Sequence, residues 1–200
     1  MTGENIQLRS FSYVLVPSDF GSLSIVWGED EKRPRVYRVF LPGGGTPVQD
    51  LVQMTFPGAR PASCHAMAEL RRRIQRFLEG AAVDFGLDAI ALDRCSDFQR
   101  RVLLAEHRIP RGWVSTYGYM AGILGVPGGA RAVGRALSGN PFPIIIPCHR
   151  VIRSDGRLGG FQGGIEMKRR LLEFEEVRFA QDGRVFADRF YVGKAETTAG

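Results

Sequence analysis

The chain has 200 residues, with 27 Lys and Arg, 21 Asp and Glu, and a formal net charge of +6. This length can bury a hydrophobic core without disulfide bonds, and the 3 cysteines show no paired spacing, which favours a reducing compartment. The first residues lack the pattern of a signal peptide, and no window approaches about 18 consecutive apolar residues. We therefore expect an intracellular protein without a transmembrane helix, cytoplasmic and associated with the nucleoid, or nuclear if the source is eukaryotic.

The positive charge is concentrated in one part of the chain. Residues 91–180 contain 14 Lys and Arg against 8 Asp and Glu, whereas the remainder contains 13 of each. A local basic excess is typical of a surface that binds a polyanion such as a nucleic acid. A merely solvated surface is the alternative that the charge alone leaves open.

The first ninety residues are expected to form a β-rich unit. Residues 12–16, 23–27 and 36–41 are rich in β-branched and aromatic residues and are separated by turn residues, so each predicts a strand. A helix is predicted over 63–79, where apolar residues recur at three- and four-residue spacing. Residues 81–92 are predicted to form one more extended stretch and a linker.

Residues 96–138 are predicted to be mostly helical. Ser96, with Gln99 three residues later, fits a capping box and predicts a helix that runs to residue 107. Two short helices joined by a Gly-rich turn are typical of a helix-turn-helix, and this pattern covers residues 114–124, 125–129 and 130–138.

The helix predicted over 130–138 can present a cationic face. Val133 and Leu137 can turn inward, and Arg131 and Arg135, four residues apart, then share an outer face beside the small Gly134. Such a face can approach a nucleic-acid groove closely. Arginines that are merely solvated are the alternative.

Cys148 carries more information than any other residue. It follows Ile144–Ile146, a β-branched run that predicts a short buried strand, and Pro147, which would end that strand because it has no N–H. A cysteine at a rigid strand end, followed directly by the basic imidazole of His149, is how a fold presents a nucleophile. A buried cysteine that acts only as a small apolar residue is the alternative.

The motifs around Cys148 favour the nucleophile. Residues 147–150 read Pro-Cys-His-Arg, residues 156–161 read Gly-Arg-Leu-Gly-Gly-Phe, and Lys168–Glu175 have the pattern Lys-x-x-Leu-Leu-x-x-Glu. In these motifs the chain resembles the alkylguanine-DNA alkyltransferases, over roughly residues 95–176. Upstream matches in the same register are Tyr117, Ala130–Gly134 and Asn140–Pro141.

The resemblance implies an α+β fold with two domains. Residues 1–92 would form a ribonuclease-H-like α/β domain, rich in strands and with one long helix. Residues 93–180 would form a mostly helical, winged-helix-like domain that contains the helix-turn-helix and the alkyl acceptor. Residues 181–200 would be a C-terminal extension, and residues 194–200 are expected to be a frayed tail.

The resemblance also implies DNA repair by base flipping. The expected partner is double-stranded DNA that carries O6-alkylguanine, with O4-alkylthymine as a second lesion to consider, and the protein is expected to act as a monomer. Helix 130–138 would enter the minor groove, and Arg131 would fill the gap left by the extruded base, which offsets part of the unstacking cost. The DNA-contacting residues implied in this way are Arg131, Tyr117, Ala130, Gly134, Arg135, Ser154 and Gln99.

The implied reaction is an in-line displacement in which Cys148 accepts the alkyl group and is not regenerated. A thiol of ordinary pKa is mostly protonated at neutral pH, so a partner must take its proton. The resemblance assigns this role to His149, acting through a water and oriented by Glu175. Asn140 would link the recognition helix to the cysteine, and Tyr117 would lie at the flipped base and its phosphate. The implied base pocket contains Pro143, Gly159, Gly160, Phe161 and Gln162.

Two details qualify the resemblance. Gln162 stands where some relatives have a small hydroxyl residue, so the sequence does not decide whether this position donates a hydrogen bond to the lesion oxygen. Arg150 is expected to be an internal ion-pair partner and not a catalytic residue. No cofactor or metal is expected, because Cys64, His65 and His107 do not make up a four-ligand zinc set.

Three other functions remain as alternatives. One is a protein that recognises alkylated bases without repairing them, although such relatives lack the cysteine. Another is a helix-turn-helix regulator, which would leave Cys148, His149 and Glu175 without a purpose. The third is a cysteine hydrolase, for which multiple turnover of an ester or amide would be diagnostic.

Overall fold

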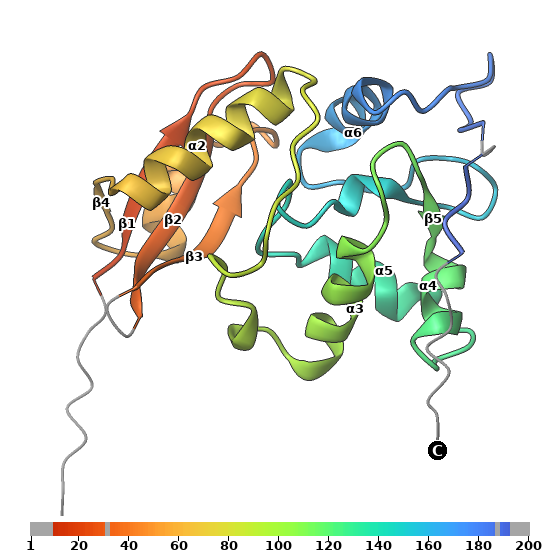
Figure 1. Cartoon of the computed structure of the whole chain (residues 1–200), viewed down its shortest axis with the longest axis horizontal. Coiled ribbons are helices and arrows are strands. Elements are labelled where there is room, and N and C mark those ends of the chain that lie inside the picture. The colour runs from red at the N-terminus through yellow and green to blue at the C-terminus, as the bar shows by residue number, and fades with distance from the viewer. Residues whose placement is uncertain (1–9, 31–32, 187–188, 193–200) are drawn as a thin grey trace, which may run out of the picture.

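The computed structural model describes residues 10–30, 33–186 and 189–192, and it shows a mixed α+β protein. In Figure 1 a sheet crossed by a long helix forms one side of the molecule, and shorter helices form the other. The predicted α+β class is confirmed. The largest cluster of buried apolar residues includes members of both sides, such as Val16 and Val133, so the two sides share a core. The domain boundaries at residues 92 and 180 stay a prediction.

The larger sheet among the described residues has the strand order β3-β2-β1-β4. Strands β1 and β2, and β2 and β3, pair antiparallel, whereas β1 and β4 pair parallel. All three predicted strands are present, and the second one continues to Asp30. The strands are β1 (Ser12–Val16), β2 (Leu23–Asp30), β3 (Arg33–Phe40) and β4 (Arg60–Pro61).

Two helices cover the two faces of this sheet, namely α1 (Val48–Thr55) and α2 (His65–Leu78). Successive side chains of a strand point to opposite faces. Val14 and Val16 therefore belong to the apolar cluster that includes buried residues of α2, and Leu15 packs against the cluster that includes those of α1. The helix predicted over 63–79 is confirmed as α2. Helix α1 is not apparent from the sequence, because it is short and buries only Val48 and Val52.

The second side contains four α-helices and a two-stranded parallel sheet in the described part of the chain. The predicted helix-turn-helix is present, since α4 and α5 pack on each other across a Gly-rich turn, and α3 packs on α5. The elements are α3 (Asp97–His107), α4 (Tyr117–Ile123), α5 (Ala130–Ser138), α6 (Gly164–Phe174), β5 (Ser115–Thr116) and β6 (Val151–Ile152).

Ser96 caps the N-terminus of α3, as predicted. Its Oγ accepts a hydrogen bond from the backbone N–H of Gln99 at 3.3 Å. The side chain of Gln99 does not turn back to complete the capping box. It extends instead to the C-terminal end of α5.

The strand predicted over Ile144–Ile146 is wrong. These residues form a tight turn closed by a hydrogen bond from Ile146 N–H to the carbonyl oxygen of Phe142 at 2.8 Å, and Ile144 has a φ of 75°. The β-branched residues are buried by the surrounding core and not by a paired strand, and positive φ is strained for such a residue. Cys148 therefore follows a strained turn.

The start of the helix predicted over 114–124 is also wrong. Ser115 and Thr116 form β5, which pairs with β6 immediately after the Cys148 turn, and the helix begins at Tyr117. Thr116 then caps α4, because its Oγ1 accepts a hydrogen bond from Tyr119 N–H at 3.1 Å. The pairing of β5 with β6 thus connects Tyr117 to the cysteine segment.

The C-terminal extension packs against this small sheet. Val114 N–H donates to the carbonyl oxygen of Arg189, and Tyr191 N–H donates to that of Val114. Val185 is buried in a second apolar cluster with Val114 and other residues around β6 and α6. The tail predicted over residues 194–200 lies outside the described residues.

Candidate active site

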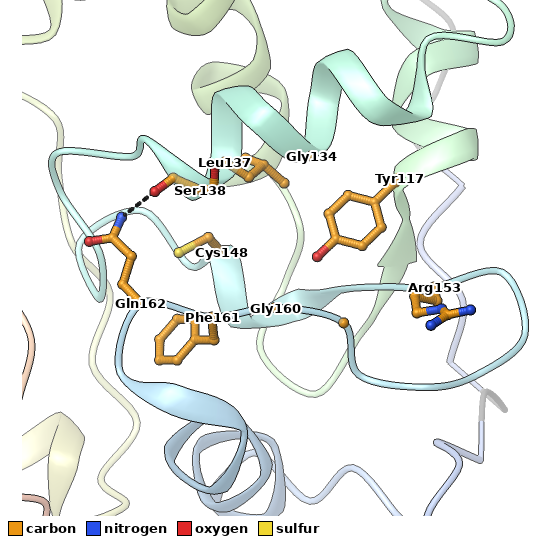
Figure 2. Close-up of a pocket in the computed structure, with 10 residues that line it drawn as sticks. Tyr117, Gly134, Leu137, Ser138, Cys148, Arg153, Gly160, Phe161 and Gln162 are labelled. Atoms are coloured by element: carbon orange, nitrogen blue, oxygen red, sulfur yellow. Dashed lines mark hydrogen bonds between the residues drawn. The ribbon is translucent and has the colours of Figure 1, made fainter. Parts of the chain in front are cut away.

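Cys148 lines a cavity of about 500 Å³ between α5 and the loop that precedes α6 (Figure 2). The cysteine begins a single 3-10 turn, Cys148–Arg150, and is 6% exposed. The hydroxyl of Tyr117 points into the same space from α4 (Figure 2). The cavity is lined by Tyr117, Gly134, Leu137, Ser138, Cys148, Arg153, Gly159, Gly160, Phe161 and Gln162.

Behind the cysteine, His149 and Glu175 form a buried pair. His149 Nε2 lies 3.0 Å from Glu175 Oε1, and both side chains are fully buried. Arg150 donates to both carboxylate oxygens of Glu175, at 2.9 Å and 2.7 Å, which confirms its prediction as an ion-pair partner. The backbone N–H of Gly112 donates to Glu175 Oε2 at 3.3 Å. No larger residue fits at Gly112, where φ is 75° and a Cβ would lie 2.9 Å from the carbonyl oxygen of Glu175.

The pKa values of this pair favour an ionised Glu175 and a neutral His149. Burial raises the pKa of Glu175, but the favourable charges and hydrogen bonds of His149 and Arg150 outweigh it and lower that pKa to about 2. The pKa of His149 is lowered, chiefly by burial and further by the charges of Arg150 and Lys168, although Glu175 acts in the opposite direction. A neutral His149 that donates from Nε2 to Glu175 leaves Nδ1 as an acceptor, and this buried Nδ1 has no hydrogen-bond partner among the described residues.

The thiol itself is held in its neutral form. Burial raises the pKa of Cys148 to about 12, the charge of Glu106 adds to this, and a hydrogen bond with the Asn140 side chain acts in the opposite direction. Thiolate must therefore be produced at the moment of reaction by a base.

Asn140 connects α5 to the cysteine segment, as expected. Its Oδ1 accepts from Phe142 N–H at 2.9 Å, and its Nδ2 donates to the carbonyl oxygen of Ile146 at 3.3 Å. Both bonds are buried, so the amide fixes the turn that leads to Cys148.

A second hollow, of about 610 Å³, lies on the exposed face of α5. It is lined by Arg131, Gly134, Arg135 and Ser138, two of which also line the Cys148 cavity. Both arginines are exposed, while Val133 and Leu137 are buried beneath them, as the sequence predicted.

Four of the sequence-predicted residues line neither hollow and belong neither to the His149–Glu175 pair nor to the Asn140 connection. Pro143 is buried in the turn before the cysteine, Ala130 starts α5, and Ser154 is exposed in the loop after β6. The side-chain amide of Gln99 donates to carbonyl oxygens at the end of α5, so its prediction as a DNA contact is not supported by where its side chain lies. The cavity residues absent from the prediction are Leu137, Ser138 and Arg153.

Lys168 and Glu106 are two buried charged residues whose roles the sequence did not reveal. Lys168 Nζ donates to the carbonyl oxygens of Val151 at 2.7 Å and Leu158 at 2.6 Å, which ties α6 to the loop that walls the cavity. Neither carboxyl oxygen of Glu106 has a hydrogen-bond partner among the described residues. Burial raises the pKa of Glu106 to about 8, against the charges of Lys168 and Arg150.

The C-terminal part of the chain is similar to known DNA methyltransferases. A protein-family model described as "6-O-methylguanine DNA methyltransferase, DNA binding domain" matches residues 97–177. The methylated-DNA–protein-cysteine methyltransferase of Methanothermobacter thermautotrophicus is 50% identical over 112 residues, which are 56% of this chain and 62% of that protein. The enzyme of that name from Mycobacterium tuberculosis is 44% identical over 115 residues, which are 57% of this chain and 68% of that protein. This chain belongs to the methylated-DNA–protein-cysteine methyltransferase family.

Solved structures extend the family likeness beyond the aligned C-terminal part. The M. tuberculosis O6-methylguanine methyltransferase has a TM-score of 0.66 at 32% identity, and the match covers 83% of this chain and 93% of that chain. M. tuberculosis OGT in complex with DNA has a TM-score of 0.67 at 30% identity, over 82% of this chain and 92% of that chain. The family predicted from the sequence is confirmed.

Within the residues that the structure describes, the protein contains no helix that is long and apolar enough to cross a membrane. The same part of the chain contains no group of three His, Cys, Asp or Glu residues placed to hold a metal ion. His107 Nε2 instead lies 2.7 Å from the carbonyl oxygen of Phe85.

Proposed function

We propose that this protein repairs DNA by transferring an alkyl group, typically methyl, from O6 of guanine to Sγ of Cys148. The observation that carries the proposal is the buried thiol that lines a cavity, with His149 next to it in the same turn and Glu175 paired with His149 from the end of α6. A volume of about 500 Å³ lies within the usual range for small-ligand sites. Family membership supports the same reaction.

The proton of Cys148 passes through a bridging water to Nδ1 of His149, while Glu175 accepts the Nε2–H bond and stabilises the imidazolium. A sulfur–carbon bond forms as the carbon–oxygen bond of the lesion breaks. The displaced guanine takes up one proton, so the thiol proton is balanced and His149 returns to its neutral form. The product is a thioether, which offers no easy leaving group, so each molecule reacts once.

DNA is bound by the exposed face of α5, and the damaged base is flipped into the cavity. Arg131 and Arg135 supply positive charge there, and Gly134 allows close approach to a groove. Tyr117 lies at the cavity mouth with its hydroxyl protonated, because burial raises its pKa to about 12. Ala130, at the start of α5, and the exposed Ser154, in the loop after β6, are further DNA contacts in this proposal, and Arg153 adds a cation to the cavity lining.

Finer features of the fold belong to the same proposal. Residues 1–92 form a ribonuclease-H-like domain and residues 93–180 a winged-helix-like DNA-binding domain, followed by the extension 181–200. We infer that the protein acts as a monomer on duplex DNA, in the nucleoid-associated cytoplasm or in a nucleus, and O4-alkylthymine is a second candidate lesion.

Intact mass spectrometry after incubation with duplex DNA containing O6-methylguanine tests the proposal. The expected result is a gain of one methyl group per molecule, located by peptide mapping on Cys148, with no gain in Cys148→Ser. Cys95→Ser is the matched control and should react like the wild type. DNA binding without a mass gain would favour the lesion-recognition alternative, and repeated ester or amide turnover would favour the hydrolase.

A further inference from the structure

The amide of Gln162 joins the cavity wall to the end of α5. Its Nε2 donates to the carbonyl oxygens of Ser138 at 3.1 Å and Asn140 at 2.8 Å. Figure 2 shows the bond to Ser138 crossing the edge of the cavity beside Cys148. The last carbonyl groups of a helix have no partner within the helix, so these acceptors depend on an outside donor.

A second glutamine holds the same helix end from another element. Nε2 of Gln99, in α3, donates to the carbonyl oxygens of Ala136 at 3.1 Å and Gly139 at 2.9 Å. A side-chain amide has two N–H donors, and each of the two glutamines uses both on α5 and the residues directly after it.

The two parts joined by Gln162 have different tasks in the proposed function. Helix α5 carries Arg131 on its exposed face and Leu137 on the cavity lining, whereas the wall carries Gly160 and Phe161. The other end of the wall is held by Lys168, which donates to the carbonyl oxygen of Leu158 at 2.6 Å. The wall is therefore anchored to α6 at one end and to α5 at the other.

We propose that Gln162 is a positioning residue that ties the wall of the base pocket to the DNA-reading helix, so that the cavity keeps its shape before the base enters. This inference rests on the proposed function. Both amide N–H groups of Gln162 are committed to carbonyl oxygens, so Gln162 acts through the wall and not through a hydrogen bond to the lesion oxygen. A cavity that is already ordered avoids an ordering cost when the base binds.

Gln162→Met tests this role, because methionine has a similar length but no N–H donors. The apparent affinity for free O6-alkylguanine base should fall about tenfold, the loss expected from one or two neutral hydrogen bonds. The first-order transfer rate at saturating base should stay within about twofold of the wild-type rate, because the groups that perform the reaction are untouched. Gln162→Glu should lose more affinity, since a carboxylate would face two carbonyl oxygens. Gln181→Met, at an exposed glutamine, is the control.

Amide hydrogen exchange of the substrate-free protein provides a readout that does not require transfer. Gln162→Met should increase exchange together at residues 138–140 and 160–163, and Gln181→Met should not. Unchanged exchange at both segments, or a loss of transfer rate with unchanged affinity, would overturn the positioning role. If the wild type transfers no alkyl group but the exchange result holds, the proposed function fails while the tie between wall and helix stands.

A double-mutant cycle with Gln99→Met separates positioning from direct substrate contact. Both glutamines hold one helix end, so their effects on base affinity should be non-additive. Strictly additive effects would mean that the two glutamines act independently of each other, and would contradict the inference.

Discussion

Cys148 and His149 are neighbours in the sequence and are both buried, with opposite effects on their pKa values. Burial raises the pKa of the thiol to about 12 and lowers that of the imidazole, so both are neutral at rest. Of Cys148, His149 and Glu175, only Glu175 is ionised, because Arg150 and His149 keep its pKa near 2 despite its burial. The site at rest therefore contains a protonated Cys148 thiol next to an unprotonated His149 imidazole.

Removing this base should slow alkyl transfer and change its pH dependence. His149→Ala should reduce the transfer rate at neutral pH by roughly 10²- to 10⁴-fold, the usual contribution of a general base. Because the pKa of Cys148 is far above 7, each added pH unit supplies about ten times more thiolate, so alkaline pH should restore part of the loss. The measurement is the single-turnover rate against pH.

Glu175→Gln should be less severe than His149→Ala, since glutamine keeps the shape and can accept one hydrogen bond. The double variant should be little slower than His149→Ala, because the two residues act as one unit. Thermal melting of each variant serves as the check on folding. A folded His149→Ala protein with the wild-type rate and pH profile would show that another group activates the thiol.

Glu106 should make the free energy of unfolding depend on pH. Its folded pKa of about 8 lies above the ordinary value of 4.5, so its folded form keeps a proton that the unfolded form loses. The resulting stability is complete below pH 4.5 and is lost as the pH rises through 8. Glu106→Gln should therefore gain stability relative to the wild type over this window, by up to about 1.4 kcal/mol per unit of pKa shift.

Denaturant unfolding at pH 5 and pH 8.5 measures this difference. The matched control is Asp97→Asn, which removes a carboxylate from an exposed side chain of the same helix. Parallel pH curves for the wild type and Glu106→Gln would contradict the buried, protonated state of Glu106.

At the scale of elements, α5 has a buried apolar face and an exposed cationic face. Its buried residues Val133 and Leu137 fix it to the core, and its arginines remain exposed. Gly134 lines both hollows, so the proposed DNA-binding surface and the Cys148 cavity meet on one helical turn.

Arg131→Ala should slow transfer from duplex DNA about 10- to 100-fold, because base extrusion costs a few kcal/mol that Arg131 helps to offset. Reaction with the free modified base should change by less than about twofold, since no extrusion is needed. The slope of log affinity against log salt should also fall by about 1. Arg60→Ala, on strand β4 at the other side of the molecule, removes the same charge and should alter neither rate. Equal losses on both substrates would mean that Arg131 supports the fold.

Across the whole molecule, the Cys148 site is built by residues from both sides of the fold. The ring of His149 packs between Phe77 of α2 and Phe161 of the cavity wall, with centroid distances of 5.9 Å and 6.4 Å. The C-terminal extension supports the opposite end of the site, since Val185 N–H donates to the carbonyl oxygen of Gly156 in the loop that leads to the wall.

The extension should contribute measurably to stability. Val185→Ala should lower the free energy of unfolding by about 1–3 kcal/mol, because it removes buried methyl groups from the cluster around β6 and α6. Val192→Ala makes the same change at a side chain that is 64% exposed and should have little effect. Denaturant unfolding of both variants checks this, and equal midpoints would show that the extension is not part of the cooperative fold.

Local signals in the sequence were sufficient for much of the fold. Runs of β-branched and aromatic residues between turn residues predicted the strands, and apolar residues at three- and four-residue spacing predicted α2. Ser96 predicted the start of α3, and the motifs around Cys148 predicted the family. These signals are carried by residues that are close in the sequence, so a short window is enough to recognise them.

The tertiary structure decided what depends on distant partners. Ile144–Ile146 form a strained turn because the core buries them without a neighbouring strand, which no local propensity expresses. The resemblance places Gln99 at the DNA and Gln162 in the base pocket, yet both amides donate to carbonyl oxygens at or just after the end of α5, 22 to 40 residues away. The perturbed pKa of Cys148 likewise arises from burial by several elements at once, so the sequence predicted Cys148 as the nucleophile, and the packing determined its state of protonation.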